Sequence, residues 1–258
     1  MNTFRTKKNI FLSYIAVSVS SCTFLFLLAS FQKNAEKEYP SQQKKVLIYS
    51  KTNGYRHESI LAGINAIKKL GVENNFLVDA TEDSLDINTE KLKSYQAVIF
   101  LSTTGKVLGE KQELALQKFM KKGGGFVGVH AATDCEYNWP WYGAMIGASF
   151  ESHPKQQIAK LVVVDNKQLS TKHLPSIWER KDEWYNFKNI NPEISVLIKI
   201  DESSYTGGKN NNNHPMAWYH NFEGGRVFYT ALGHTVESYS EPLFLQHLLG
   251  GIKYAMRK

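Results

Sequence analysis

Histidines and carboxylates lie where a chain of alternating strands and helices would turn. His57 ends the polar segment 53–57, and His130 follows the apolar run 126–129. Glu183 precedes a run of aromatic residues, a setting that disfavours an ionised carboxylate and suits an acid or a base. Imidazole, with an ordinary pKa of about 6.5, gains and loses protons near neutral pH. These residue types indicate acid–base chemistry.

The stretch Gly128-Val129-His130-Ala131-Ala132 has the glycine-framed pattern with which many α/β enzymes present a nucleophile on a sharp elbow. Its central residue is a histidine, where those enzymes have serine or cysteine. We therefore expect His130 to act as a base or as a metal ligand, and Glu183 as a second acid or base. The expected catalytic residues are His130, Glu183, His57 and Asp134.

Histidines combined with a carboxylate can also hold a divalent cation at a catalytic site with an open position. The candidate ligands are His130, His153 and His214, and the candidate ions are Zn²⁺ and Mn²⁺. The chain has no His-x-x-x-His or Cys-x-x-Cys spacing, so distant segments would have to assemble such a site. Chemistry with and without a metal both stay open.

A bound sugar ring would need an aromatic surface and hydrogen-bonding groups. Trp218 is the candidate platform for stacking, although the same residue could belong to the core. The other candidate substrate-binding residues are Asn53, Tyr55, Thr103 and His234.

Apolar strands alternate with helical segments from residue 45 onward, which is typical of a parallel sheet with helices on both faces. The expected strands are 46–50, 75–79, 97–101 and 126–130, and the expected helices are 58–70, 89–93 and 109–122. In such sheets ligands bind at the carboxyl ends of the strands, and the polar segments that begin at Asn53, Ser102 and His130 follow three of these strands.

Longer extended segments follow Gly147. They are expected at 157–164, 184–187, 194–200, 216–222 and 226–231. Glu223-Gly224-Gly225 indicates a hairpin turn between the last two. A closing helix is expected over 242–256, weakened by the pair Gly250-Gly251.

The first 31 residues have the pattern of an export signal. Lys7-Lys8 precedes an apolar run over 10–31, which could be cleaved or could stay as a membrane anchor. Cys22 follows small residues as in a lipoprotein signal, but the residues after it are still apolar, where a lipoprotein normally becomes polar. Lipidation of Cys22 is therefore the less favoured alternative. A polar linker is expected at 32–44 and the folded domain at 45–258. These features predict an exported protein, either periplasmic or membrane-anchored, that meets the membrane through its N-terminal segment if this stays uncleaved.

Composition fits one globular domain. The chain has 258 residues, of which 42% are hydrophobic, and a formal charge of +7. Arg5, Lys7 and Lys8 belong to the N-terminal segment, which leaves about +4 for the rest. Its basic residues are scattered without interleaved aromatics, so nucleic acid is not an expected partner. A homo-oligomer stays open.

Several of these segments together resemble the ThuA-like family, named for a trehalose utilisation protein. The resemblance covers about residues 45–256 and lies in the segments 52–57, 124–130, 153–154, 183–187, 214–218 and 225–234. It implies a fold of the class I glutamine amidotransferase-like superfamily, which is a flavodoxin-like three-layer sandwich with a mostly parallel central sheet. It also implies a role in the utilisation of trehalose and related disaccharides, including their 3-keto derivatives, and thus a small carbohydrate as the ligand.

That superfamily has a cysteine nucleophile at the elbow, where this sequence has His130. Cys135 lies five residues downstream, so glutamine hydrolysis through a thioester is not expected. We expect instead an isomerase, lyase or hydrolase acting on keto-sugars or glycosides, because a ring carbonyl acidifies the adjacent C–H for removal by a base. The alternative is a non-catalytic carbohydrate-binding or sensory module tethered at the membrane.

Overall fold

The computed structural model describes residues 43–211 and 213–257. The predictions for the N-terminal signal or anchor, and for nearly all of the linker, fall outside these residues. Within them, no helix combines the length and the hydropathy that a membrane span requires.

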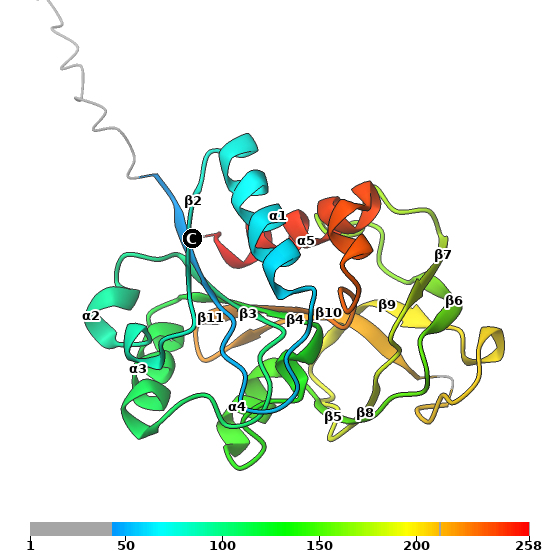
Figure 1. Ribbon diagram of the computed structural model, residues 1–258, viewed down its shortest axis with the longest axis horizontal. Coiled ribbons are helices and arrows are strands. Elements are labelled where there is room, and N and C mark those ends of the chain that lie inside the picture. Colours follow the sequence, from blue (N-terminus) through cyan, green and yellow to red (C-terminus); the bar gives the residue numbers. More distant parts are fainter. Residues whose placement is uncertain (1–42, 212, 258) are drawn as a thin grey trace, which may run out of the picture. The chain divides into compact units, whose positions relative to one another are not determined.

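A nine-stranded sheet forms the centre of the described unit, with strand order β2-β1-β3-β4-β11-β10-β9-β6-β7 (Figure 1). Its strands are β1 Lys45–Tyr49, β2 Leu77–Thr81, β3 Ala97–Leu101, β4 Gly125–Val129, β6 Gln157–Val163, β7 Ile177–Asp182, β9 Ser195–Ile200, β10 Pro215–Phe222 and β11 Gly225–Thr230. The first five in the order pair in parallel, and the remaining pairs are antiparallel. A separate hairpin pairs β5 Ser149–Ser152 with β8 Asn186–Lys188.

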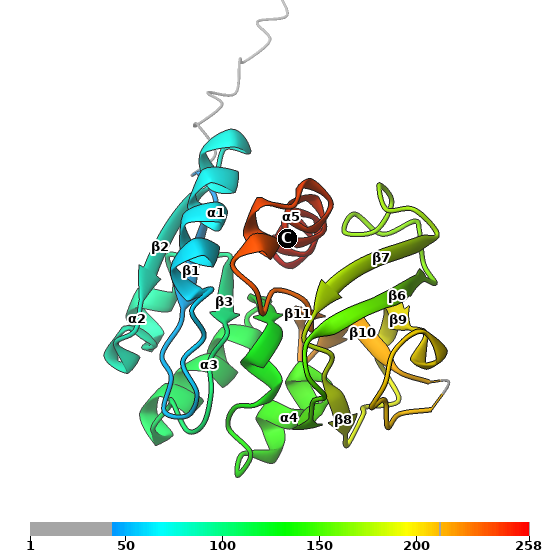
Figure 2. The ribbon, with the colours of Figure 1, turned by 45° about the vertical axis from the view of Figure 1, so that its right-hand side comes forward.

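The central strands are apolar throughout because both faces of the sheet are covered. Every residue of β3 and β4 is buried, as a parallel strand between two layers of helices requires. Helices α1 Ile60–Glu73 and α5 Pro242–Ala255 lie on one face, and α3 Glu110–Lys121 and α4 Pro140–Ile146 lie on the other (Figures 1 and 2). A short helix, α2 Thr89–Leu92, packs beside α3. This arrangement is the predicted three-layer α/β sandwich.

The predicted elements of the parallel half are present with small shifts, the largest being at α1, which begins two residues and ends three residues later than expected. The hairpin turn is confirmed, since Glu223 and Gly224 both have positive φ, at 46° and 90°. The strand expected at 184–187 begins two residues later in the structure, where β8 starts at Asn186.

Among the α-helices and strands of the described residues, α4, β5 and β7 were not predicted. The sequence pattern does not predict β7 because two of its buried positions are the charged residues Arg180 and Asp182, where an alternating strand normally has apolar residues.

Candidate functional site

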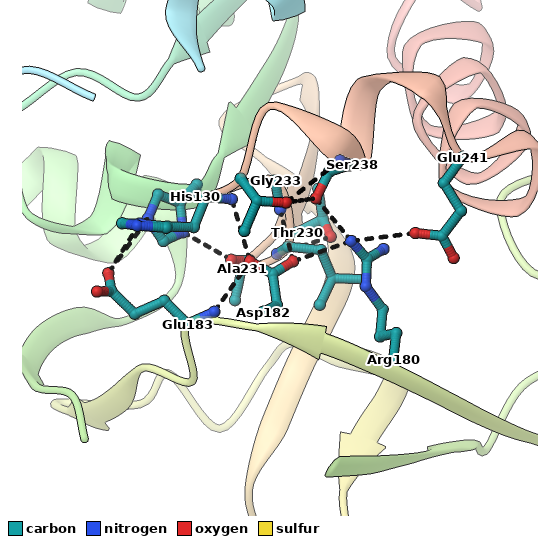
Figure 3. A network of polar contacts seen from close by, with 12 residues as sticks. His130, Arg180, Asp182, Glu183, Thr230, Ala231, Gly233, Ser238 and Glu241 are labelled. Carbon is teal, nitrogen blue, oxygen red and sulfur yellow. Dashed lines mark hydrogen bonds and ion pairs between the residues drawn. The ribbon is translucent and has the colours of Figure 1, made fainter. Parts of the chain in front are cut away.

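Four side chains from distant parts of the chain meet beyond the carboxyl ends of the parallel strands. His57 follows β1, His130 follows β4 and His234 lies in the loop after β11. These three strands run in the same direction, so their carboxyl ends share one edge of the sheet. Glu183 comes from the other side, directly after the edge strand β7 (Figure 3).

His130 occupies the elbow that its sequence pattern predicts. Its backbone has φ 50°, in the left-handed region that costs a non-glycine residue roughly 1 kcal/mol or more. Gly128 makes the tight approach before it possible, because a Cβ there would lie 2.9 Å from the Tyr229 ring. The turn therefore presents an imidazole where related folds present a nucleophile.

The hydrogen bonds of His130 determine which of its nitrogens faces the other ligands. Its Nδ1 lies 2.8 Å from the carbonyl oxygen of Ala231, which can only accept, so Nδ1 carries the proton. In the neutral ring Nε2 then has a free lone pair, which points toward His57 and His234. A backbone carbonyl that orients a histidine in this way is typical of metal ligands.

The distances between the four residues match the geometry of a small cation site. His130 Nε2 lies 3.1 Å from His57 Nε2 and 3.0 Å from His234 Nδ1. Glu183 Oε2 lies 3.5 Å from His130 Nε2 and 3.1 Å from His234 Nδ1. Tetrahedral ligands of Zn²⁺, at bond lengths of about 2.1 Å, are ~3.4 Å apart. One ligand atom from each of the four residues lies within 4.8 Å of the others, so this group could hold a metal ion.

The electrostatics of the group also suit a cation. Burial, helped by the neighbouring His130 and His234, lowers the pKa of His57 to about 3, so its ring is neutral at pH 7, as a metal ligand must be. Burial raises the pKa of Glu183, as the sequence suggested, but the adjoining imidazoles of His130 and His234 outweigh burial and hold the pKa well below its usual range. Glu183 is therefore ionised, as a carboxylate that binds a cation must be, which corrects the expectation of a disfavoured charge.

Two further titratable groups flank the four. His153 is partly exposed, and its Nδ1 lies 3.1 Å from Glu183 Oε1, the oxygen turned away from the cluster. Asp134 accepts a hydrogen bond of 2.6 Å from the Tyr137 hydroxyl, and burial raises the pKa of its carboxyl group.

A cavity of about 270 Å³ opens beside the cluster. Its walls include His57 and His234, and the remaining lining residues are Tyr55, Glu58, Gln156, Thr235, Val236 and Glu237. The Tyr55 side chain is largely exposed, and its ring meets that of His57 edge-on at a centroid distance of 4.9 Å. Gln156 Nε2 lies 2.8 Å from His234 Nε2. Gln156, Glu58 and Glu237 carry no motif that could have marked them in the sequence.

Two residues predicted for the site lie elsewhere. His214 is fully buried and uses both nitrogens locally, with Glu202 Oε1 and the Tyr185 carbonyl oxygen each at 2.7 Å, so it is no ligand of the cluster. Trp218 is fully buried too, and its indole N–H donates to the Ile146 carbonyl oxygen at 2.8 Å. It therefore belongs to the core and offers a sugar no surface.

Thr103 and Asn53 also differ from expectation. Thr103 is fully buried, so a substrate cannot reach its hydroxyl group. The side chain of Asn53 is exposed, but its amide donates to the Lys106 carbonyl oxygen and braces the loop. Of the three predicted metal ligands, His130 belongs to the cluster, His153 contacts Glu183 from outside it, and His214 lies elsewhere. The other members of the cluster are His57, His234 and Glu183.

A parallel core, an elbow after β4 and a polar site at the strand ends make the fold similar to that of class I glutamine amidotransferase-like domains, here with histidine at the elbow. The model of the ThuA family, described as trehalose utilisation, matches residues 45–255. The chain belongs to this family.

Solved structures agree with this assignment. A ThuA-like protein from Bacteroides uniformis is 25% identical, with a TM-score of 0.71 over 82% of this chain and 91% of that one. A second, from Parabacteroides merdae, is 20% identical, with a TM-score of 0.69 over 83% and 90%. The fold is also similar to part of a β-galactosidase from Bacillus circulans. The match covers 83% of this chain and 30% of that one, with 14% sequence identity and a TM-score of 0.54. None of the curated proteins matches the chain.

Proposed function

We propose that this protein is a cation-dependent enzyme of sugar utilisation that acts on neutral keto-sugars or glycosides. The observation that carries the proposal is the convergence of three imidazole nitrogens and one carboxylate oxygen, with the lone pair of His130 directed inward by the Ala231 carbonyl group. Membership of the trehalose utilisation family supports the class of substrate.

The residues that would hold the cation are His57, His130, His234 and Glu183. A bound Zn²⁺ or Mn²⁺ would polarise an oxygen of the sugar and so acidify the neighbouring C–H or O–H. Asp134 and His153 flank the cluster and would accept or return the proton. A carboxyl group whose pKa is raised by burial is suited to that task.

The cavity beside the cluster supports a neutral, polyhydroxylated ligand. Glu58, Gln156 and Glu237 can accept hydrogen bonds from sugar hydroxyls, and the ring of Tyr55 offers an exposed apolar face. Among the described residues that line it there is no lysine or arginine to balance a phosphate. The two carboxylates would repel phosphorylated sugars.

The experiment is a mass-spectrometric assay of disaccharides and their 3-keto forms. Full-length protein would be incubated with each sugar, with and without added Zn²⁺ or Mn²⁺, in parallel with His130→Ala. We expect a change in mass or isomer that needs the cation and falls by at least about a thousandfold in the variant, the range in which an essential catalytic group is lost. Metal analysis of both proteins by plasma mass spectrometry gives the cation content directly.

If turnover persists after chelation, in protein with no bound metal, the reaction is acid–base chemistry that needs no cation, and the cation-dependent proposal is wrong. Binding of sugars without turnover under any condition would replace the enzyme by the carbohydrate-binding or sensory module.

We also propose that the protein is exported through residues 1–31. The support is the sequence Lys7-Lys8 followed by the apolar run 10–31. Fractionation of cells that express the full chain tests the proposal, and recovery of the protein only from the cytoplasm would contradict it.

A further inference from the structure

Asp182 accepts hydrogen bonds from the backbones of two of the four cluster residues, although it is not itself one of the four. It is the last residue of β7 and is fully buried. Glu183 follows it in the chain, and the loop with Gly233 and His234 packs against its carboxylate (Figure 3).

The Asp182 carboxylate accepts three backbone N–H groups from these two segments. Oδ1 accepts from the amide of Glu183 at 2.9 Å and from the amide of His234 at 3.2 Å. Oδ2 accepts from the amide of Gly233 at 3.0 Å. One side chain thus joins the backbones of residues 51 positions apart in the sequence.

Arg180, two residues earlier on the same face of β7, neutralises this buried carboxylate. Its Nη2 lies 3.1 Å from Asp182 Oδ2 and donates to Ser238 Oγ at 2.7 Å, while Glu241 Oε2 lies 3.3 Å away. The guanidinium carbon also lies 4.9 Å from the Trp178 ring centroid and 5.1 Å from that of Phe244. The Asp182 side chain is therefore held in one orientation.

We propose that Asp182 is a positioning residue that assembles Glu183 and His234 before a cation binds. The inference rests on the proposed function, since it concerns the same cluster. Hydrogen bonds from backbone N–H groups to a carboxylate are charge-assisted and stronger than neutral ones. They restrain the backbone at two ligands that no regular element joins, because His234 lies in a loop and Glu183 follows the end of β7.

The test compares Asp182→Asn with Glu136→Gln. Asparagine keeps the shape of the side chain, but its amide group brings N–H donors against the donors of Gly233 and Arg180. Glu136 is a matched control because it is also a buried carboxylate, and its Oε1 accepts the amides of Val107 and Leu108 at 2.7 Å each, in the loop between β3 and α3, which carries no residue of the cluster. Both changes remove one buried charge from full-length protein.

The primary readout is the dissociation constant of Zn²⁺ by titration calorimetry at pH 7.5, with the visible spectrum of the Co²⁺ form as a second. We expect Asp182→Asn to weaken Zn²⁺ binding by about 10- to 100-fold, the usual effect of losing an outer partner of a metal ligand, and to change the Co²⁺ spectrum. The Zn²⁺ dissociation constant of Glu136→Gln should stay within about twofold of the wild-type value, even if its melting temperature falls as much as that of Asp182→Asn. Equal affinities in the two variants would overturn the inference.

A second measurement needs no variant and stays informative if Asp182→Asn does not fold. Hydrogen exchange of the metal-free wild-type protein reports the amides of Glu183, Gly233 and His234 one by one. We expect all three to be protected before any metal is added. Fast exchange that slows only when Zn²⁺ is present would mean that the cation orders the segments, and would refute the role of Asp182.

The two proposals fail in different ways. Wild-type protein that binds no Zn²⁺, Mn²⁺ or Co²⁺ removes the cation-dependent function. Wild-type protein that binds Zn²⁺ tightly, together with an unchanged Asp182→Asn, removes only the inference about Asp182.

Discussion

His130 is restrained at its backbone and at its side chain, and the two restraints together decide what the elbow presents. The positive φ turns the residue out of the strand β4, and the Ala231 carbonyl group holds the proton on Nδ1. Asparagine or glutamine at this position could follow the turn but would offer an amide, which is a weaker ligand than an imidazole lone pair. The residue type therefore matters for the chemistry more than for the fold.

At the same scale, Tyr55 should contribute to binding of the sugar and little to stability. Its side chain is 65% exposed, so Tyr55→Ala removes few core contacts. An aromatic contact with the ligand is worth about 1 kcal/mol, so we expect KM to rise roughly fivefold with kcat within about twofold. Steady-state kinetics on the sugar found in the assay measure both constants.

Leu61→Ala is the control for Tyr55→Ala, because Leu61 on α1 is 68% exposed and does not line the cavity. Both variants should melt within about 2 °C of the wild type, as surface changes of a few tenths of a kcal/mol do. An unchanged KM in Tyr55→Ala would show that the sugar does not reach this ring.

At the scale of elements, α5 lies close enough to the sheet that its glycines are required for packing. A Cβ on Gly251 would lie 2.2 Å from ring carbons of Phe228 on β11, far inside contact distance. Alanine stabilises a helix by about 1 kcal/mol relative to glycine, whereas overpacking of a core costs about 1–3 kcal/mol. We expect Gly251→Ala to destabilise the protein by up to about 2 kcal/mol, the difference between the two effects, measured by urea unfolding.

Gly143→Ala in α4 is the matched control. A Cβ there would have its nearest neighbour, Ser149 Oγ, at 4.0 Å, so the helix propensity of alanine is gained without a clash. This variant should be more stable by up to about 1 kcal/mol. The idea of close packing fails if Gly251→Ala also gains stability.

At the scale of the whole molecule, buried neutral histidines make stability depend on pH. His247 is fully buried, with Nδ1 2.9 Å from the Ser170 carbonyl oxygen and Nε2 3.1 Å from Thr230 Oγ1. Burial lowers the pKa of His247 to about 3, against about 6.5 in the unfolded chain. Between these two values the unfolded chain binds the extra proton, so the free energy of unfolding falls as the pH falls.

This difference predicts a loss of about 2 kcal/mol from His247 alone between pH 7 and pH 5. Urea unfolding at both values, with chelator present so that metal binding does not contribute, measures it. His247→Gln keeps hydrogen-bonding groups but does not titrate, so its stability should fall by about 2 kcal/mol less over the same interval. Identical pH dependence in the two proteins would exclude His247 as a source.

The sequence by itself predicted the parallel sheet and included the four cluster residues among its candidates: His57, His130 and Glu183 as catalytic and His234 as substrate-binding. The apolar runs of β1, β3 and β4 and the helical spacing between them predict a parallel sheet, because such strands must be apolar on both sides. Since parallel strands end at one edge, residues that follow them, such as His57 and His130, were expected to meet. His234 was assigned to the substrate, and the structure brings it into the same group.

Only the tertiary structure decided which polar groups satisfy one another. Glu183 joins the cluster because β7 directs it there, and the buried Arg180 and Asp182 concealed that strand from a pattern of apolar alternation. His214 and Trp218 have residue types suited to a site, yet they bind Glu202 and the Ile146 carbonyl group inside the core. The periodicity of a sequence indicates which side of an element is buried, but it does not indicate a hydrogen-bond partner far away in the chain. The hydrogen bonds that Asp182 accepts from Gly233 and His234 could therefore be found only in the tertiary structure.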